Sequence, residues 1–471
     1  MPRTTRAQRV RDPLHNLIEF NSDQFESTLW RVIQTRPFQR LRRIRQLGFS
    51  ELVFPGATHT RFAHSIGVFH TARDLTASIE RTMDFPVQDH QLRVALAASL
   101  VHDVGHGMFS HSFELVRKEL DLPMARHEQV SEELIRNSEI SREFEELGSG
   151  FADDVANVLG RKEPATLYDS VVSSQFDADR LDYMQRDRLM TGVQSSGIDA
   201  TWLMSNLEIG TVRTGADEEA SGTVDTLVVG PKAFRAAENY VLSLFQLYPN
   251  VYLHKTTRAA ERLFVRLMTR VFELVTKGQK GKVGLHPNHP IRRFVEEPEN
   301  IEKALALDDA VFWGALHTMT EAKDPMVQRC AIGLRDRKLP KCIDIRRLLE
   351  ERESAIMEPK EKAARLKVAC KNIVEKIEQW SSDRREEEPK ILVDETTREP
   401  YKKIKGSESP LNQILIRHGE NRFEDMVRLS PIVESAQTFV VCRAYHDEDD
   451  TEGRDMVQNI IGTYQLKGED A

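Results

Sequence analysis

The feature that most constrains this chain is a histidine-rich turn directly after an apolar segment. Residues 91–102 are apolar nearly all round, which predicts a helix at the centre of a helical bundle. At its end stand His102 and Asp103, followed by His106 and His111. Unpaired polar groups cost free energy when buried, and mixed imidazole and carboxylate ligands suit a divalent metal such as Mn, Fe, Zn or Mg. The sequence therefore predicts a metal-dependent hydrolase.

A metal centre of four protein ligands needs two groups from elsewhere in the chain. His64, in the stretch TRFAHSIG, opens a predicted helix upstream. The run QFDADRLDYMQRD supplies carboxylates, and the residues alone do not choose among Asp177, Asp179, Asp182 and Asp187. Two histidines and two aspartates would leave coordination positions open for water and substrate, as catalysis requires. The alternative is a chance surface His-Asp pair, which the buried helix and the two further histidines disfavour.

Composition narrows the class of protein. A length of 471 residues predicts two or three compact units, and 40% hydrophobic with 30% charged residues indicates a globular chain. No apolar run approaches a membrane span and the N-terminus lacks a signal-peptide core, so we expect a cytoplasmic protein that does not bind membranes. The net charge of −8 disfavours affinity of the whole protein for nucleic acid. The four cysteines form no CxxC pair, which indicates neither a zinc knuckle nor a disulfide framework.

Apolar periodicity predicts a mainly α chain in three parts. Residues 1–275 should form a helical-bundle core with a small β-hairpin at 212–229, and Pro37 should divide the helical stretch 24–47. The Gly- and Lys-rich residues 276–304 read as a linker. Residues 305–471 should form an α+β lobe with a regulatory or oligomerisation role, including a helix striped by Leu366 to Trp380 and a strand at 439–445.

Several motifs together resemble one known family. They are DPLHNLIEF (12–20), PFQRLRRIRQLGFSELVFPGATHTRFAHSIGV (37–68), HDVGHGMFSHSFE (102–114), HE (127–128), FDADRLDYMQRD (176–187) and VYLHK (251–255). In order and spacing they are similar to the HD-domain deoxynucleoside triphosphate triphosphohydrolases, which include bacterial dNTPases and the animal enzyme with a sterile alpha motif. The resemblance covers about 250 residues. It implies an HD-domain helical bundle, one divalent metal and a dNTP substrate.

Carried onto this sequence, the resemblance implies a ligand set and a group of catalytic residues. The metal ligands would be His64, His102, Asp103 and Asp179, which selects Asp179 from its neighbours. The α-phosphate would be surrounded by His106, His111 and His127. His111 would transfer the proton, because imidazole titrates near neutral pH. Glu114 would orient His111, and Glu128 would support His127.

The resemblance also implies substrate contacts. Arg61, Arg180 and Tyr183 would bind the phosphates, for which the planar donor fork of arginine is suited. Gln46 and Asp187 would hold the sugar 3′-hydroxyl and Leu47 would pack near the base. Tyr252 would crowd the sugar 2′ position and exclude ribonucleotides. Without the resemblance, Leu47 and Tyr252 read as ordinary core residues.

The implied reaction is attack of metal-activated water on the α-phosphorus, which yields a deoxynucleoside and inorganic triphosphate. The biological role would be dNTP-pool control or phage defence. Two alternatives stay open: an HD-type phosphodiesterase or nuclease that acts on nucleic acid or a signalling nucleotide, and a nucleotide-sensing oligomeric scaffold with weak catalysis.

Regulation is a further implication, because many relatives are oligomers switched on by nucleotides. Gln39 and Arg42 match activator-site positions, so we expect an activator nucleotide and a homo-oligomer, either a dimer or a tetramer. Gln34 or a neighbour replaces the aspartate that reads guanine in some relatives, and Leu244 replaces a phosphate-binding arginine. One basic run fits an activator nucleotide or single-stranded nucleic acid, with a solvated helix face as the alternative; it contains Arg36, Arg40, Arg42, Arg43 and Arg45.

Overall fold

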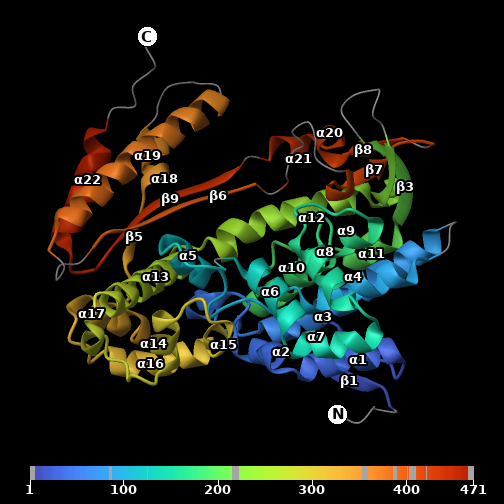
Figure 1. Ribbon diagram of the computed structural model, residues 1–471. Coiled ribbons are helices and arrows are strands. Elements are labelled where there is room, and N and C mark those ends of the chain that lie inside the picture. The colour runs from blue at the N-terminus through green and yellow to red at the C-terminus, as the bar shows by residue number, and fades with distance from the viewer. Residues whose placement is uncertain are drawn as a thin grey trace. The chain divides into compact units, whose positions relative to one another are not determined.

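The computed structural model describes most of the chain as helices with three small sheets (Figure 1). The described residues are 6–83, 87–124, 126–214, 222–352, 359–385, 390–399, 401, 410–420, 422–436 and 438–464. Their contacts divide the chain into two compact units. The first is Met1–Val251 with Ala304–Asp309 and Glu399–Gln437, and the second is Tyr252–Lys303 with Ala310–Arg398 and Thr438–Ala471. The mainly α fold is as expected from sequence.

The centre of the first unit is built from three helices, α3 (Arg61–Thr82), α4 (Asp89–Val101) and α10 (Ala178–Thr191). Helix α3 packs against both of the others, and α4 is buried from Val94 through Val101, which confirms the expectation of a helix apolar nearly all round. The other helices of this unit are α1 (Gln24–Gln34), α2 (Arg36–Arg40), α5 (His111–Glu119), α6 (His127–Asn137), α7 (Glu139–Phe144), α8 (Phe151–Gly160), α9 (Leu167–Val172), α11 (Ala200–Ser205), α12 (Phe234–Leu247), α20 (Met426–Leu429) and α21 (Pro431–Ser435).

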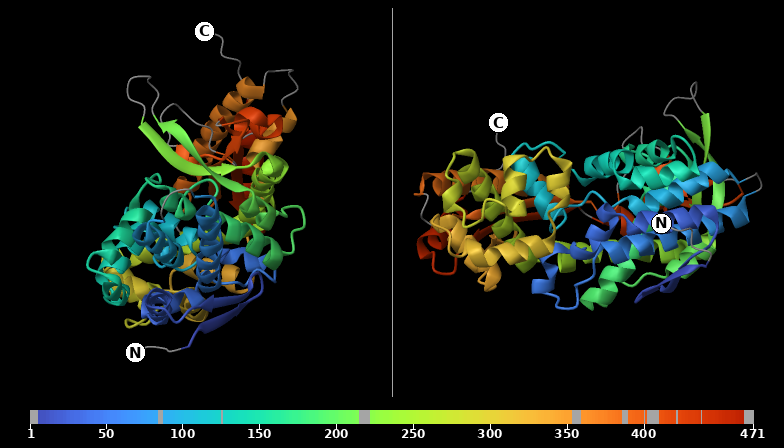
Figure 2. Two further views of the ribbon diagram at one scale, coloured as in Figure 1. Left: turned by 90° about the vertical axis from the view of Figure 1, so that its right-hand side faces the viewer. Right: turned by 60° about the horizontal axis from the view of Figure 1, so that its bottom comes forward.

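Two sheets belong to the first unit. The predicted hairpin is confirmed as β3 (Leu207–Thr214) and β4 (Gly222–Val229), with Val212 opposite Val224, and Figure 2 shows it as a twisted ribbon. The polar turn GADEEASG (215–222) is expected between the two strands, and its residues 215–221 lie outside the described residues. Strands β7 (Leu415–Arg417) and β8 (Phe423–Asp425) extend this sheet in the order β3-β4-β7-β8. A second hairpin, β1 (Gln8–Asp12) with β2 (Asn16–Phe20), was not predicted.

The second unit carries the three-stranded sheet β5-β9-β6. Its strands are β5 (Lys341–Asp344), β6 (Leu392–Arg398) and β9 (Phe439–His446), and β9 confirms the strand expected at 439–445. The predicted stripe is also confirmed, because Leu366, Cys370, Ile373 and Ile377 of α19 are buried in one core. The helices are α13 (Lys255–Thr276), α14 (Pro290–Glu296), α16 (Asp309–Met319), α17 (Pro325–Arg335), α18 (Ile345–Arg352), α19 (Pro359–Asp383) and α22 (Thr451–Thr463), and α15 (Ile301–Leu305) crosses the boundary between units.

These units differ from the expected division at 275 and 304. The chain returns twice to the first unit: residues 304–309 bring Asp308 and Asp309 to Arg43 and Arg45, and residues 399–437 bring β7 to β4. The segment expected as a linker contains α14, with buried Ile291 and Phe294. A break at Thr35 precedes α2, in which Pro37 is the second residue, so the stretch is divided near Pro37 as predicted, but helix does not continue to residue 47. None of the described helices is long and apolar enough to cross a membrane.

Candidate metal centre and nucleotide cavity

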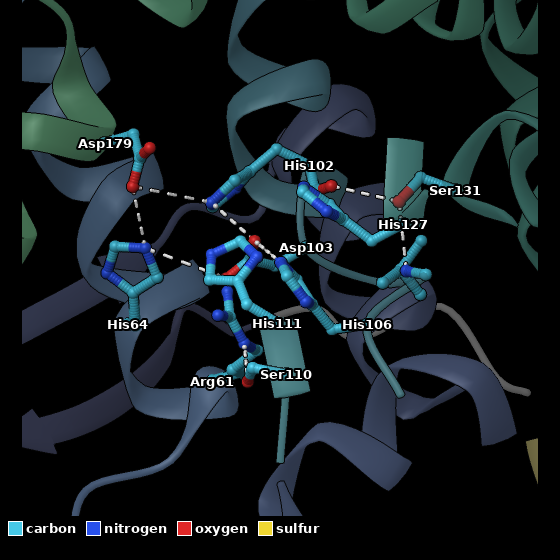
Figure 3. A network of polar contacts seen from close by, with 12 residues as sticks. Arg61, His64, His102, Asp103, His106, Ser110, His111, His127, Ser131 and Asp179 are labelled. Carbon is cyan, nitrogen blue, oxygen red and sulfur yellow. Dashed lines mark hydrogen bonds and ion pairs between the residues drawn. The ribbon is translucent and has the colours of Figure 1, made fainter. Parts of the chain in front are cut away.

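Three helix ends bring the four predicted metal ligands together (Figure 3). His64 lies in the first turn of α3, whose N-cap is Thr60. His102 and Asp103 follow the last residue of α4, and Asp179 lies in the first turn of α10. In Figure 3, Asp179 and His64 face His102 and Asp103 across a small gap. Residues from three separate elements therefore surround one point.

The spacing of the ligand atoms fits one divalent ion. His64 Nε2 is 2.9 Å from Asp179 Oδ1 and 3.8 Å from Asp103 Oδ2. His102 Nε2 is 3.3 Å from Asp103 Oδ1 and 3.8 Å from Asp179 Oδ1. Ligands about 2.1 Å from an octahedral ion lie about 3 Å apart when adjacent and about 4.2 Å apart when opposite. His64, His102 and Asp103 thus lie close enough to share one ion, and Asp179 approaches both histidines; these four residues form the metal cradle.

The Nδ1 atoms of His64 and His102 face away from the other ligands and are hydrogen-bonded, which leaves the inner Nε2 atoms in position to bind an ion. His102 Nδ1 bonds to the carbonyl of Ser99 at 2.9 Å, and its buried Nε2 has no hydrogen-bond partner. His64 Nδ1 bonds to Asp182 Oδ2 at 2.8 Å. Metal-binding histidines characteristically donate their second N–H to a carbonyl or carboxylate in this way. The donor set fits a divalent cation and leaves the identity of the ion open.

Charge at this cluster favours protonated histidine and ionised carboxylates when no ion is bound. Burial disfavours a charged His64, but hydrogen bonds to Asp179 and Asp182 outweigh burial and raise its pKa to about 10. Burial opposes the ionised form of Asp103, yet Arg61 and the nearby histidines hold its pKa well below the usual range. His64 donating to Asp179 also lowers the pKa of that carboxyl, against the effect of burial.

Metal binding is therefore expected to release about one proton per ion. The pKa of about 10 means that His64 carries its extra proton at pH 7, whereas a metal binds only the neutral imidazole. Apparent affinity should fall as pH decreases below 10, by roughly tenfold per unit. Calorimetric titration of metal-free protein with Mn²⁺, in buffers of different ionisation enthalpy, measures the proton count. Binding without proton release would contradict this charge assignment.

Arg61 lies beside the predicted metal ligands. Its Nη1 is 2.5 Å from Asp103 Oδ2 and its Nε donates to Ser110 Oγ at 2.7 Å. Ser110 and the preceding Phe109 both have positive φ, 55° and 52°, a region that non-glycine residues rarely adopt. Asp309 Oδ1 accepts the Phe109 N–H at 2.7 Å and so supports this strained turn. The turn directly precedes His111, the first residue of α5.

The predicted catalytic residues form a second cluster beside the first. The rings of His106 and His127 stack with centroids 3.7 Å apart, and His111 lies edge-on at 5.2 and 5.7 Å from them. Glu114 is 2.5 Å from His127 Nδ1 and 3.3 Å from His111 Nδ1. His106 Nε2 approaches Asp103 at 3.2 Å and joins the two clusters. The side chain of His111 is 71% exposed, so it can exchange protons with solvent.

Glu114 supports His127 more closely than Glu128 does. Glu128 lies 3.6 Å from His127 Nδ1 and is 44% exposed. Burial would lower the pKa of His127, but the hydrogen bond to Glu114 raises it. Burial raises the pKa of Glu114, but the hydrogen bonds to His111 and His127 outweigh burial and lower it. An ionised glutamate thus favours the protonated form of His127.

A cavity of about 300 Å³ opens onto both clusters. Its wall includes His102 and Asp179 from the metal cradle and His127 from the second cluster. This volume is at the lower end of the range for small-molecule sites. Its other lining residues are Glu128, Leu159, Lys162, Val172, Ser173, Ser174, Asp177, Arg180, Tyr183, Tyr248 and Asn412. Arg180 and Tyr183 were predicted phosphate contacts, whereas no motif marks Lys162 or Asn412 as a site residue.

The remaining predicted substrate residues do not line this cavity. Gln46 and Leu47 follow the short 3-10 turn after α2, and Gln46 Oε1 is buried without a hydrogen-bond partner. Asp187 is buried and pairs with His59 at 2.8 Å, a partner that sequence reasoning missed. Tyr252 ends the π-helical turn Tyr248–Tyr252 and is the first residue of the second unit.

The basic run before α3 is used largely for contacts inside the first unit. Buried Arg40 donates to the carbonyls of Leu307 and Val104, at 3.0 and 3.2 Å, and Arg43 pairs with Asp308 at 2.6 Å. Arg42 lies over the Phe62 ring and donates to Gln39 Oε1 at 2.9 Å. The run is therefore not a free cationic face. Arg42 is the exposed member beside Gln39, the other predicted activator residue.

Residue 67, one turn after His64 on α3, has room only for glycine. The glycine in the motif RFAHSIGV is the one sequence signal for this close packing. A Cβ at this position would overlap Asp182 Oδ1 and Arg186 Nη2. Gly67→Ala should therefore destabilise the protein by about 3 kcal/mol, because it overpacks the core and displaces a buried ion pair. Urea denaturation measures this loss. Gly314→Ala is the control, since a Cβ at Gly314 meets nothing within 4 Å. Equal stability of the two variants would contradict the prediction.

Comparisons with known proteins agree with this geometry. Residues 61–184 match the HD domain family, a span that begins just before His64 and ends after Asp179. The uncharacterized protein YwfO of Bacillus subtilis is 33% identical over 302 residues, which is 64% of this chain and 64% of that protein. The deoxynucleoside triphosphate triphosphohydrolase SAMHD1 of Gallus gallus is 33% identical over 217 residues, 39% of this chain and 34% of the enzyme. The matched part thus spans less than two thirds of either relative.

The fold also matches solved structures along most of the chain. A phosphohydrolase of Bacteroides thetaiotaomicron has a TM-score of 0.69 and 23% identity, and the match covers 93% of this chain and 99% of that one. A hypothetical protein of Aquifex aeolicus has a TM-score of 0.65 and 23% identity, with coverage of 97% and 99%. At this identity the likeness establishes the fold. Residues 61–184 are thus similar to HD domains, and the chain as a whole shares the fold of these two solved structures.

Proposed function

We propose that this protein is a metal-dependent dNTP triphosphohydrolase that releases a deoxynucleoside and inorganic triphosphate. The observation that carries the proposal is the cavity shared by the metal cradle, the histidine cluster and two cations. His102, Asp179 and His127 line it together with Arg180 and Lys162. A phosphate chain needs positive charge along its length and a site of activation at one phosphorus. The similarity to SAMHD1 supports a deoxynucleotide as the substrate.

The proposed ion is one divalent cation, Mn, Fe, Mg or Zn, held by His64, His102, Asp103 and Asp179. When bound, it supplies Lewis-acid stabilisation of charge on the phosphoryl oxygens and favours ionisation of water. His106 and His127, stacked beside Asp103, are proposed to face the α-phosphate, and the contact with Glu114 favours the protonated form of His127. A protonated imidazole stabilises negative charge that develops in the transition state.

Exposed His111 is proposed to give a proton to the departing 5′-oxygen of the deoxynucleoside. Its side chain is 71% exposed, so the ring can exchange protons with solvent, and Glu114 lies 3.3 Å from Nδ1, which orients the ring. Water adds to the α-phosphorus, the bond from that phosphorus to the 5′-oxygen breaks, and the proton from His111 completes the alcohol. The proton that the attacking water loses passes to solvent, from which exposed His111 is protonated again.

Substrate contacts extend the same proposal. Arg61, Arg180 and Tyr183 would bind phosphate oxygens, and Gln46 with Asp187 would hold the 3′-hydroxyl. Leu47 would pack near the base, and Tyr252 would exclude a 2′-hydroxyl. Support for these roles is the match to the SAMHD1 enzymes, and, for Arg180 and Tyr183, their position in the cavity wall.

Regulation by an activator nucleotide at Gln39 and Arg42, in a homo-oligomer, is proposed on the same similarity. Exposed Arg42 donates to half-buried Gln39, and this pair is compatible with a ligand site. A role in dNTP-pool control or phage defence would follow from the activity.

The test is an assay of each dNTP, alone and in pairs, with Mn²⁺ and chromatographic separation of the products. Deoxynucleoside with inorganic triphosphate is the expected result, and activity only in pairs would reveal an activator. Cleavage of single-stranded nucleic acid or a signalling nucleotide, with dNTPs left intact, would replace the proposal by the phosphodiesterase alternative. Nucleotide binding without any product would favour the scaffold alternative.

Lys162 gives a sharper test of where the phosphate chain lies. It is exposed in the loop before α9 and lines the cavity. Lys162→Ala should raise KM for a dNTP about tenfold with little change in kcat, because a charge-assisted contact to phosphate contributes about 1.5 kcal/mol or more. Steady-state kinetics measure the split, and Lys118→Ala, at an exposed lysine of α5 outside the cavity wall, is the control. An unchanged KM would move the phosphate chain away from this wall.

A further inference from the structure

A buried carboxylate behind the metal cradle connects it to the N-terminal hairpin. Asp182 is fully buried, and each of its oxygens makes two hydrogen bonds. Oδ2 accepts from His64 Nδ1 at 2.8 Å and Arg186 Nε at 2.8 Å. Oδ1 accepts from His15 Nε2 at 2.7 Å and Arg186 Nη2 at 2.9 Å. All four lone-pair sites of the carboxylate are therefore used.

The hairpin turn between β1 and β2 is built around the same network. Asp12 Oδ1 accepts the N–H groups of Leu14 and His15, at 2.9 and 3.0 Å, which is the local bond pattern that aspartate forms in turns. Asp12 Oδ2 also binds Arg186 Nη1 at 2.7 Å. Asp12 thus shapes the turn and fixes it to α10. The His15 side chain on this turn is thereby held against Asp182.

We infer that the β1–β2 turn is a positioning element for the metal ligand His64, and that His15 governs how tightly the protein retains its metal without touching it. The contact runs from the His15 imidazole through Asp182 to the His64 imidazole, within hydrogen-bond distance at each step. This inference concerns the metal centre alone and holds for any substrate of the HD domain.

The physical reason is the competition for Asp182 between Arg186 and the two histidines. Without His15, Oδ1 keeps only the Arg186 bond, and the carboxylate is free to turn toward the guanidinium. His64 Nδ1 then loses its well-aligned acceptor, and Nε2 no longer points into the cradle. Loss of such an outer partner of a metal-binding histidine lowers metal affinity by about 10- to 100-fold.

The experiment measures metal affinity in the absence of any nucleotide. Purified full-length protein is stripped of metal, and the dissociation constant for Mn²⁺ is measured by competition with a chelator. His15→Ala should bind about 10- to 100-fold more weakly than wild type. His15→Gln, whose amide can still donate to Asp182, should recover most of this loss.

The control changes the same hairpin at its exposed cross-strand pair. Arg9 and Glu19 pair at 2.5 Å with side chains 64% and 43% exposed, so Arg9→Ala with Glu19→Ala should leave metal affinity unchanged. Circular dichroism checks that every variant is folded. Wild-type affinity in folded His15→Ala overturns the inference, as does an equal loss in the control. The affinity measurement contains no nucleotide, so its outcome does not depend on whether the protein hydrolyses dNTPs. Failure of the dNTP proposal and failure of this inference can therefore be told apart.

Discussion

Replacing His102 and Asp103 together by alanine should reduce phosphohydrolase activity by at least about a thousandfold. The change removes two of the four cradle groups, including the buried His102 Nε2 that has no hydrogen-bond partner of its own. It also leaves the buried Arg61 guanidinium without the carboxylate that lies 2.5 Å away. A divalent ion commonly supplies several kcal/mol of transition-state stabilisation, which corresponds to a loss of this size. Hydrolysis rate and bound metal per chain measure the effect.

His90→Ala is the matched control for this double variant. His90 lies in α4, the helix that His102 follows, but its side chain is 64% exposed and pairs with Asp154 at the surface. We expect wild-type metal content and activity from it. If the double variant kept both its metal and its rate, the cradle would not be the metal centre.

Replacing Glu114 by alanine should lower kcat by about 10²- to 10⁴-fold while metal content stays at the wild-type level. Among the described residues, the ion pairs of Glu114 are with His106, His111 and His127. None of these three belongs to the metal cradle. Without it, His111 loses the carboxylate nearest its ring. The pKa of His127 also falls, because burial then acts without the opposing hydrogen bond. The alkaline limb of the pH–rate profile should therefore move to lower pH.

Glu128→Gln provides the comparison for Glu114. This carboxylate is half-exposed and 3.6 Å from His127, so its removal should change kcat by less than about fivefold. The two variants together separate the sequence expectation, in which Glu128 supports His127, from the observed geometry. A larger loss in Glu128→Gln than in Glu114→Ala would restore the original assignment, and an unshifted pH profile in Glu114→Ala would remove Glu114 from proton control.

Local sequence was sufficient for the first pair of ligands and insufficient for the rest of the cradle. The apolar helix before His102 and Asp103 placed this pair beside the core, and in the structure Asp103 is buried while the His102 side chain is 14% exposed. Asp179 and Asp182 are three residues apart, so both face the same side of α10. Which of them meets the inner nitrogen of His64 and which the outer one depends on how α10 packs against α3. No spacing in the chain encodes that choice.

The missed parts of the fold depend on partners far away in the sequence. Strand β6 pairs Val393 with Ala444 and has no local hairpin turn to reveal it. Strands β7 and β8 do form a local hairpin, but each has only three residues, and the parallel pairing of Leu415 with Val228 joins β7 to a distant strand. The β1–β2 hairpin is local, but its turn is stabilised by Asp12 bonding to Arg186 from α10. Asp309 similarly reaches Arg45 and Phe109 from a segment expected to begin another lobe. Tertiary contacts, rather than periodicity, define these elements.

The most direct test of the central claim is hydrolysis of a dNTP in water enriched in ¹⁸O, with mass analysis of both products. The proposed attack of water on the α-phosphorus, with cleavage of its bond to the 5′-oxygen, predicts one ¹⁸O in inorganic triphosphate and none in the deoxynucleoside. Label in the 5′-hydroxyl of the deoxynucleoside would contradict attack at phosphorus. Formation of deoxynucleoside monophosphate and pyrophosphate would contradict the proposed bond cleavage.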